Sequence, residues 1–208
     1  MGLLGNTRPL LVALALLLAS APVAADDRVI VVLGDSLTAG LGVAPEEAYP
    51  ALLEGRLRRA GFAYRVVNAG VSGDTSAGGL RRLDWVLRTR PEIVIVALGA
   101  NDGLRGVPVD ALRDNLTAIV TRLQASGARV LLAGMRLPPN YGAAYADAFA
   151  ETFRDVARRT SAAFLPFLLE GVGGEPALNQ TDGIHPNVAG QRAVADRIWP
   201  SLQPLLRR

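Results

Sequence analysis

Short apolar runs rich in β-branched residues alternate along the chain with longer segments whose apolar residues recur at helical spacing. A continuous run such as 29–33 (VIVVL) is typical of a strand that is covered on both faces. Five strand–helix units of this kind predict a parallel sheet with helices on both sides, an α/β fold of three-layer α/β/α, flavodoxin-like type. The expected strands are 29–33, 64–67, 93–98, 129–133 and 163–165, and the expected helices are 46–60, 80–90, 109–125, 145–160 and 187–206.

Glycine and proline residues mark where the helical segments end. Gly61 and Gly127 follow two of them, and Pro91 follows a third. In the last segment, Pro200 lacks the N–H that a helix interior needs, so we expect a kink or a break there.

The first 25 residues differ in composition from the rest of the chain. Arg8 is the only charged residue before Asp26, and the apolar run 10–19 (LLVALALLLA) has about half the length that a bilayer span needs. Small residues at 23–25 (VAA) then offer a cleavage site after Ala25. We therefore expect a signal peptide at 1–25, one domain at 26–208, and a periplasmic or secreted protein. An uncleaved membrane anchor and a buried helix are the alternatives.

Composition excludes several classes of chemistry. The chain has no cysteine and no lysine, and it has one histidine, His185. Disulfides, thiolate metal sites, a cysteine nucleophile, a Walker-type lysine, a Schiff-base lysine and multi-histidine metal sites are thus all excluded, and no metal is expected. The formal net charge is +3 and aromatic residues make up 5%, which is weak support for a nucleic-acid partner.

Four short polar segments follow predicted strands. Because ligands bind beyond the carboxyl ends of parallel strands, we expect these segments to gather at one edge of the sheet. Each segment alone is a weak signal, but four in this order at strand ends are a strong one. They are 34–38 (GDSLT), 68–74 (NAGVSGD), 99–102 (GAND) and, after a glycine-rich loop, 182–186 (DGIHP).

The residue types in these segments fit nucleophilic catalysis. A serine hydroxyl needs a base to take its proton, and histidine is the usual base near neutral pH. His185 is the sole candidate for that base, Ser36 is the predicted nucleophile, and Asp182 lies three residues before the histidine, where it could orient the ring. The backbone N–H groups of Ser36 and Gly70 and the side-chain amide of Asn101 are the predicted oxyanion-hole donors.

Each of these residues also has a structural interpretation. Ser36 or His185 could cap a helix, and Gly70 and Asn101 could form turns. Asp35 is expected to fix the turn before Ser36. Ser72 is a rival nucleophile. The chain contains no Gly-x-Ser-x-Gly, which disfavours the nucleophile-elbow hydrolase fold.

From 29 to the last helix, the four segments resemble the SGNH, or GDSL, hydrolase superfamily. The resemblance implies that Ser36 is the nucleophile, that Gly70 and Asn101 complete the oxyanion hole, and that Asp182 and His185 are the acid and base. It also implies the SGNH hydrolase fold, acyl ester and thioester substrates, and no cofactor. Relatives often have Gly-Gly-Asn-Asp where this chain has 99–102 (GAND), a departure that keeps the asparagine.

Three stretches are similar to a subgroup of secreted thioesterase I, protease I and lysophospholipase type enzymes: 34–40 (GDSLTAG), 101–106 (NDGLRG) and 136–142 (RLPPNYG). Expected partners are a small acyl ester or thioester substrate, with no nucleic acid, no stable membrane insertion after signal cleavage, and a monomeric state. Alternatives are a carbohydrate acetylesterase with the same site, and a flavodoxin-like module that holds a nucleotide or anion at Gly34, Gly40 and Gly42. Apolar candidates for substrate contact are Leu37, Leu104, Val107, Tyr141 and Ile184.

Overall fold

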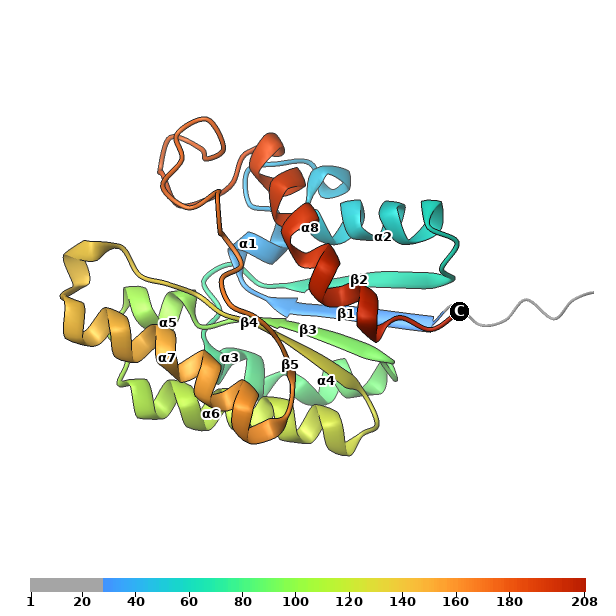
Figure 1. The fold of residues 1–208 in the computed structure, drawn as a ribbon, viewed down its shortest axis with the longest axis horizontal. Helices are drawn as coiled ribbons and strands as arrows, with labels where there is room; N and C mark the ends of the chain where they lie inside the picture. The colour runs from blue at the N-terminus through green and yellow to red at the C-terminus, as the bar shows by residue number, and fades with distance from the viewer. Residues whose placement is uncertain (1–27) are drawn as a thin grey trace, which may run out of the picture.

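A computed structural model describes residues 28–208 (Figure 1). The predicted signal peptide at 1–25 lies outside the described residues and stays a prediction. Among residues 28–208, no helix combines the length and the apolar character needed to cross a membrane.

The centre of the molecule is a parallel sheet of five strands in the order β2-β1-β3-β4-β5. This is the flavodoxin-like order, and it confirms the predicted fold class. The strand order reverses at β1, which lies between β2 and β3, so a ligand is expected beyond the carboxyl ends of these strands. The strands are β1 (Arg28–Gly34), β2 (Tyr64–Gly70), β3 (Ile93–Ala97), β4 (Arg129–Ala133) and β5 (Ala163–Leu165).

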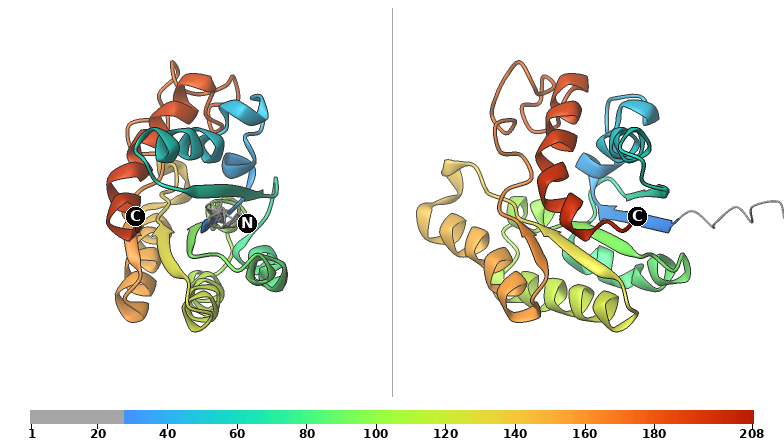
Figure 2. Two further views of the ribbon diagram at one scale, coloured as in Figure 1. Left: turned by 90° about the vertical axis from the view of Figure 1, so that its right-hand side faces the viewer. Right: turned by 45° about the vertical axis from the view of Figure 1, so that its right-hand side comes forward.

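Helices cover both faces of the sheet (Figures 1 and 2). One face carries α1 (Ser36–Ala39), α2 (Tyr49–Arg59) and α8 (Val188–Leu202). The other face carries α3 (Ser76–Arg81), α4 (Leu83–Arg88), α5 (Ala100–Leu104), α6 (Val109–Ala125) and α7 (Ala143–Thr160). Short 3₁₀ helices lie at Pro45–Glu47, Pro139–Tyr141 and Gln203–Leu205.

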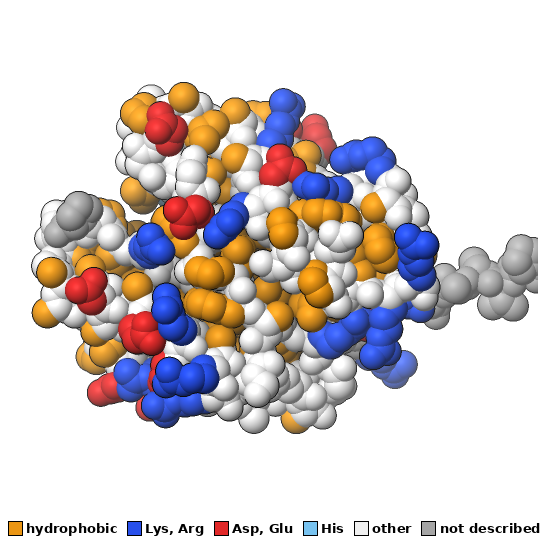
Figure 3. All heavy atoms as spheres, viewed as in Figure 1, with side chains coloured by type: hydrophobic (Ala, Val, Ile, Leu, Met, Phe, Trp, Pro, Cys, Tyr) orange, Lys and Arg blue, Asp and Glu red, His pale blue; other side chains and the backbone are white. Residues whose placement is uncertain are grey.

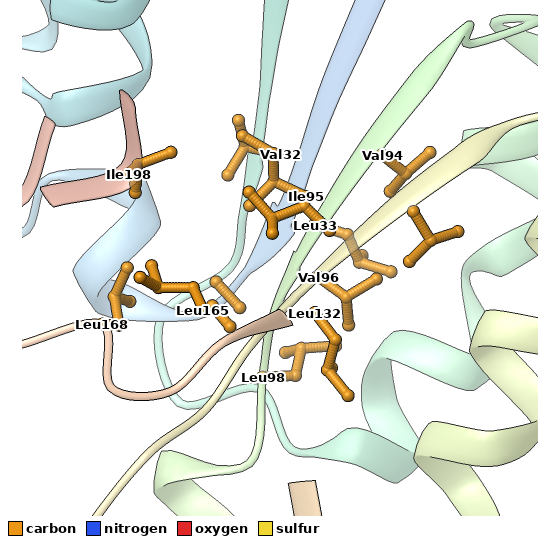
Figure 4. Close-up of a cluster of buried hydrophobic side chains, with 14 of the residues drawn as sticks. Val32, Leu33, Val94, Ile95, Val96, Leu98, Leu132, Leu165, Leu168 and Ile198 are labelled. Carbon is orange, nitrogen blue, oxygen red and sulfur yellow. The ribbon is translucent and has the colours of Figure 1, made fainter. Parts of the chain in front are cut away.

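The apolar runs are continuous because both faces of the central strands are covered. Every residue of β3 is buried. Val32 of β1 pairs with Ile95 of β3. The residues on either side of Ile95, Val94 and Val96, point to the opposite face of the sheet from Ile95. Figure 4 shows Val94 and Val96 on the side of the sheet away from Ile198 of α8, and all of these residues belong to one cluster of buried apolar side chains. This cluster fixes the strand ends that carry the polar segments.

The helices differ from the prediction at three places. The expected helix 80–90 begins earlier, at Ser76, because the Thr75 side chain caps it by accepting a hydrogen bond from Gly78 N, and it is divided at Arg82. The short helices α1 and α5 follow β1 and β3 directly and were not predicted. Helix α8 does not break at Pro200: the helix is already in its last turn there, and the N–H of Gln203 still donates to the Trp199 carbonyl.

Candidate active site

The end of β1 places Ser36 at the start of α1. Asp35 caps this short helix, since its Oδ1 accepts a hydrogen bond from the backbone N–H of Leu37 at 3.0 Å. The turn is tight because Gly34 has no side chain: a Cβ there would lie 1.9 Å from Thr38 Oγ1. The result is a serine that is 9% exposed, with its hydroxyl at the carboxyl edge of the sheet.

The loop before α8 brings His185 and Asp182 to the same place. Asp182 Oδ1 accepts hydrogen bonds from the backbone N–H groups of Ile184 and His185, both at 3.0 Å. Asp182 Oδ2 lies 2.7 Å from His185 Nδ1, and His185 Nε2 lies 2.9 Å from Ser36 Oγ. The structure therefore brings the three predicted residues into one line of contacts: carboxylate, imidazole, hydroxyl.

The charge of Asp182 determines which imidazole nitrogen carries the proton. Hydrogen bonds from the backbone N–H groups of His185 and Ile184 and from the His185 ring lower the pKa of Asp182 from 3.8 to about 2. An ionised carboxylate accepts a hydrogen bond and cannot donate one, so the neutral ring keeps its proton on Nδ1. The lone pair of Nε2 then faces Ser36 Oγ, as a general base requires.

Asn101 lies in α5, directly after β3, and it lines the same cavity as Ser36 and His185. Its Nδ2 donates to the backbone carbonyl of Asp74 at 3.0 Å and to Asp35 Oδ2 at 3.3 Å. The two acceptors fix the orientation of the amide. The bond to Asp35, at 3.3 Å, is the longer and therefore the weaker of the two.

Gly70 is placed differently from the prediction. It is the last residue of β2, its N–H donates to Asn68 Oδ1 at 2.9 Å, and it is not among the residues that line the cavity. A Cβ at Gly70 would lie 2.2 Å from the backbone nitrogen of Ala39, so this glycine allows β2 to pack closely against α1. Gly73, three residues later, does line the cavity, and within residues 28–208 its N–H has no hydrogen-bond acceptor.

Ser36, Asn101 and His185 open into a cavity of about 720 Å³ with mostly apolar walls. Three of the five predicted contact residues, Leu37, Leu104 and Ile184, line it. Val107 and Tyr141 do not. Tyr141 instead donates its hydroxyl to the Leu104 carbonyl at 3.3 Å, and the Val107 carbonyl accepts from Tyr145 at 2.8 Å, so both lie in the segments that support the Leu104 wall.

Two walls of the cavity consist of residues that were not predicted as substrate contacts. One follows β4 and contains Met135, Arg136, Leu137 and Pro138, and the other follows β5 and contains Phe167 and Leu169. The segment after β4 overlaps 136–142 (RLPPNYG), which resembles the subgroup of relatives but indicated no role for its residues, and the segment after β5 carries no motif. Figure 3 shows the molecule hollowed between the segment after β5 and the segment that leads into α7.

Among residues 28–208, no three His, Cys, Asp or Glu side chains are grouped in a way that could hold a metal ion.

Asp35, the residue before Ser36, has a buried carboxyl group and is 1% exposed. Burial raises the pKa of Asp35 from 3.8 to about 6, in spite of the hydrogen bond from Leu37 N and the nearby His185.

The raised pKa of Asp35 predicts that the protein loses stability between about pH 4 and pH 6. The native carboxyl holds its proton up to about pH 6, whereas the unfolded carboxyl releases it near 3.8. The native state therefore binds more protons over this window, and the free energy of unfolding falls as the pH rises. The rise of the Asp35 pKa from 3.8 to about 6 corresponds to a loss of about 3 kcal/mol in the free energy of unfolding across this window.

The measurement is urea unfolding of the native sequence and of Asp35→Asn at pH 4 and pH 7.5. Asn keeps an oxygen for the Leu37 N–H and does not titrate, so the variant should gain up to about 3 kcal/mol on the native protein as the pH rises. If the free energy of unfolding changed by the same amount between pH 4 and pH 7.5 in both proteins, Asp35 would not be a buried carboxyl with a raised pKa.

Ser, His and Asp in mutual hydrogen-bond contact at the carboxyl edge of a parallel sheet form the constellation that defines serine hydrolases. Along the chain these residues come in the order Ser36, Asp182, His185, with the last two three positions apart, and this order distinguishes subclasses of serine hydrolases. A model of the GDSL-like Lipase/Acylhydrolase family matches residues 32–193. The chain belongs to this family.

Two curated relatives align over most of the chain. The chain is 47% identical to "Esterase TesA" from Pseudomonas aeruginosa, over 93% of this chain and 96% of that protein. It is 41% identical to "Thioesterase 1/protease 1/lysophospholipase L1" from Escherichia coli strain K12, over 85% of this chain and 84% of that protein.

Two solved structures agree with the fold. The crystal structure of TesA is 47% identical, covers 86% of this chain and 100% of its own, and superposes with a TM-score of 0.84. The psychrotrophic esterase EstA from Pseudoalteromonas sp., solved as inhibited by monoethylphosphonate, is 38% identical, covers 86% of this chain and 98% of its own, and has a TM-score of 0.81.

Proposed function

We propose that this protein is a serine esterase and thioesterase that hydrolyses acyl esters through an acyl-enzyme intermediate. The observation that carries the proposal is the unbroken line of contacts from Asp182 through His185 to Ser36 Oγ, at 2.7 and 2.9 Å. Both distances are within the range over which a proton can be transferred. The names of the relatives, esterase and thioesterase, agree with this chemistry.

In the first half of the reaction, Ser36 Oγ attacks the acyl carbonyl carbon while His185 Nε2 takes the hydroxyl proton. The resulting tetrahedral intermediate collapses, and His185 gives that proton to the departing alcohol or thiol, which leaves Ser36 acylated. In the second half, His185 takes a proton from water, the water oxygen attacks the acyl carbon, and the carboxylic acid departs as Ser36 regains its proton. Asp182 stays ionised and stabilises the imidazolium in both halves.

The negative charge that develops on the carbonyl oxygen needs donors that are already in place. Ser36, Gly73 and Asn101 all line the cavity, and the proposed donors are the backbone N–H groups of Ser36 and Gly73 and the Asn101 amide. The N–H groups of Ser36 and Gly73 have no acceptor within residues 28–208. Gly73 thus takes the role that the sequence analysis assigned to Gly70, whose N–H is already bonded to Asn68.

The walls of the cavity favour an acyl chain as the bound group. Apolar atoms dominate the lining, and burying them against a hydrocarbon chain contributes about 0.8 kcal/mol for each CH₂ group. A carbohydrate acetylesterase would use the same three residues but would leave most of this apolar surface without a partner. The shape and chemistry of the cavity therefore favour acyl esters of longer chain length.

A nucleotide-binding or anion-binding module is less well supported. Gly34, Gly40 and Gly42 were the candidate phosphate contacts, but protein atoms fill the space where a Cβ would lie at each of them, including Ala48 Cβ at 2.6 Å for Gly40. A Cβ at Gly34 would meet Thr38, and a Cβ at Gly42 would lie 2.1 Å from the Gln180 side chain. None of the three glycines therefore has open space on the side where a Cβ would lie.

We also propose that the protein acts outside the cytoplasm, after removal of residues 1–25. The support is the short apolar run with its small-residue exit in the sequence. The absence of cysteine and the site described above are compatible with that compartment.

Labelling with a fluorophosphonate tests the proposed function. The activated Ser36 Oγ attacks phosphorus, fluoride departs, and the stable phosphonyl ester is mapped by mass spectrometry. We expect one labelled residue, Ser36, in the folded protein and none after heat unfolding. If the folded, active protein were labelled at Ser72, the role of nucleophile would belong to Ser72 and not to Ser36. If the folded protein were not labelled at all, the proposed function would be overturned.

A further inference from the structure

Arg136 stands out among the residues that line the cavity. It lies just beyond β4, it is exposed, and its guanidinium carbon lies 5.1 Å from the centroid of the Phe167 ring, which lines the cavity too. Ten arginines among residues 28–208 have a carboxylate oxygen within 4.0 Å, and Arg136 is not one of them. Its positive charge is therefore not neutralised by the protein part that the structure describes.

The charges around the cavity are unevenly distributed. Asp35 is the one carboxylate among the lining residues of the described chain, and it is buried beneath Ser36. On another wall, the Arg105 guanidinium donates to the Gly73 carbonyl at 2.9 Å, which places a second positive charge beside the cavity. Two guanidinium groups thus lie at or beside the cavity, and the remaining carboxylate near it, Asp182, is paired with His185.

We propose that Arg136 binds a phosphate group carried by the alcohol or thiol part of the acyl substrate. The inference rests on the proposed function and names the class of substrate. An acyl chain takes the apolar walls, so we expect the exposed Arg136 guanidinium to meet the polar end of the substrate. A negative charge on the substrate that pairs with Arg136 belongs to the departing alcohol or thiol part, because the acyl group itself is uncharged.

The chemistry of arginine fits this role. A guanidinium presents two parallel N–H donors that match two phosphate oxygens, and charge-assisted bonds of this kind are about twice as strong as neutral ones. Packing against the Phe167 ring restricts the side chain before the substrate arrives, so less conformational entropy is lost on binding. Phosphate of this kind occurs in coenzyme A thioesters and in lysophospholipids, and both present it on the leaving-group side.

The test compares substrates that share an acyl group and differ in phosphate. Butyryl coenzyme A is paired with S-butyryl-N-acetylcysteamine, a neutral thioester, and a lysophosphatidic acid is paired with the monoacylglycerol of the same chain. For Arg136→Gln, we expect the ratio of kcat/KM between the phosphorylated and the neutral member to fall about tenfold, mainly through KM, since one charge-assisted hydrogen bond is lost. A fall confined to one pair identifies which class of substrate the site takes.

A matched control and a second measurement keep the result interpretable. Arg65→Gln removes an exposed arginine from β2, away from the cavity lining, and should leave the ratio unchanged. Added salt should lower the ratio more for the native protein than for Arg136→Gln, in which Arg105 still remains beside the cavity. An unchanged ratio for both pairs in Arg136→Gln, with the native protein active on all four substrates, would overturn the role of Arg136 alone. A native protein inactive on every ester would overturn the proposed function together with it.

Discussion

Replacing Ser36 by alanine should lower kcat for p-nitrophenyl butyrate by at least about 10⁴-fold. The variant has no oxygen to form the acyl-enzyme, so only binding and the oxyanion-hole donors remain to assist water, and in serine hydrolases these retain about 10³–10⁴ of the rate enhancement over the uncatalysed reaction. Ser36 Oγ makes one described contact, with His185 Nε2. The fold should therefore survive the substitution, which circular dichroism and thermal unfolding will show.

Ser72→Ala is the matched control for this experiment. Ser72 lines the same cavity and was the rival nucleophile in the sequence, but the structure gives it no hydrogen bond to His185. We expect kcat of Ser72→Ala to stay within about threefold of the native value, as for a surface substitution outside the reacting atoms. Turnover by Ser36→Ala close to that of the native protein would reject Ser36 as the nucleophile.

The fold was predictable because its strands carry an unambiguous pattern. Runs such as 29–33 (VIVVL) and 93–98 (IVIVAL) contain β-branched residues on both faces, and the structure buries both faces with helices. The helix boundaries were harder to predict. The start of α3 is hard to predict because the helix contains Gly78 and Gly79, which disfavour helix, and depends on capping by Thr75. Pro200 suggested a kink or a break, but it lies in the last turn of α8, where the helix ends.

The site was predictable to the extent that it depends on strand ends and on residue chemistry. With one histidine in the chain, the candidate base could be named without knowing the fold, and the strand-end rule indicated that it would meet Ser36, as it does in the structure. Whether the proposed oxyanion donor lies at 70 or 73 depends on where β2 ends, because Gly70 pairs with Gly34 in the sheet whereas Gly73, with φ of 80°, lines the cavity. A sequence pattern does not resolve a difference of three residues at a strand end.

The walls of the cavity were the least predictable part. Arg136 and Phe167 lie 31 positions apart in the chain and meet because β4 and β5 are neighbours in the sheet. Tyr141 and Val107 were chosen for being apolar and near a motif, yet the backbone carbonyls of Leu104 and Val107 determine where the two tyrosines of this region lie. Such contacts depend on packing between loops, which local periodicity does not encode.

The second large effect is expected for Asp182→Asn, with a loss of about 10⁴-fold in kcat and little change in KM. Asn can keep the two hydrogen bonds that Oδ1 accepts from the backbone of Ile184 and His185, so the loop should retain its shape. Its amide nitrogen then occupies the place of Oδ2, 2.7 Å from His185 Nδ1, and donates a hydrogen bond where the carboxylate accepted one. The ring must move its proton to Nε2, which then donates to Ser36 Oγ and cannot take a proton from it.

Steady-state hydrolysis of p-nitrophenyl butyrate measures this effect, and Asp196→Asn is the matched control, because Asp196 is an exposed carboxylate of α8 paired with Arg56. The control should retain native kcat. The loss in Asp182→Asn should become smaller at high pH, since hydroxide can then assist attack without the histidine. If Asp182→Asn kept kcat within about tenfold of native, the carboxylate would serve to hold the loop, and the tautomer of His185 would have to be fixed by another group.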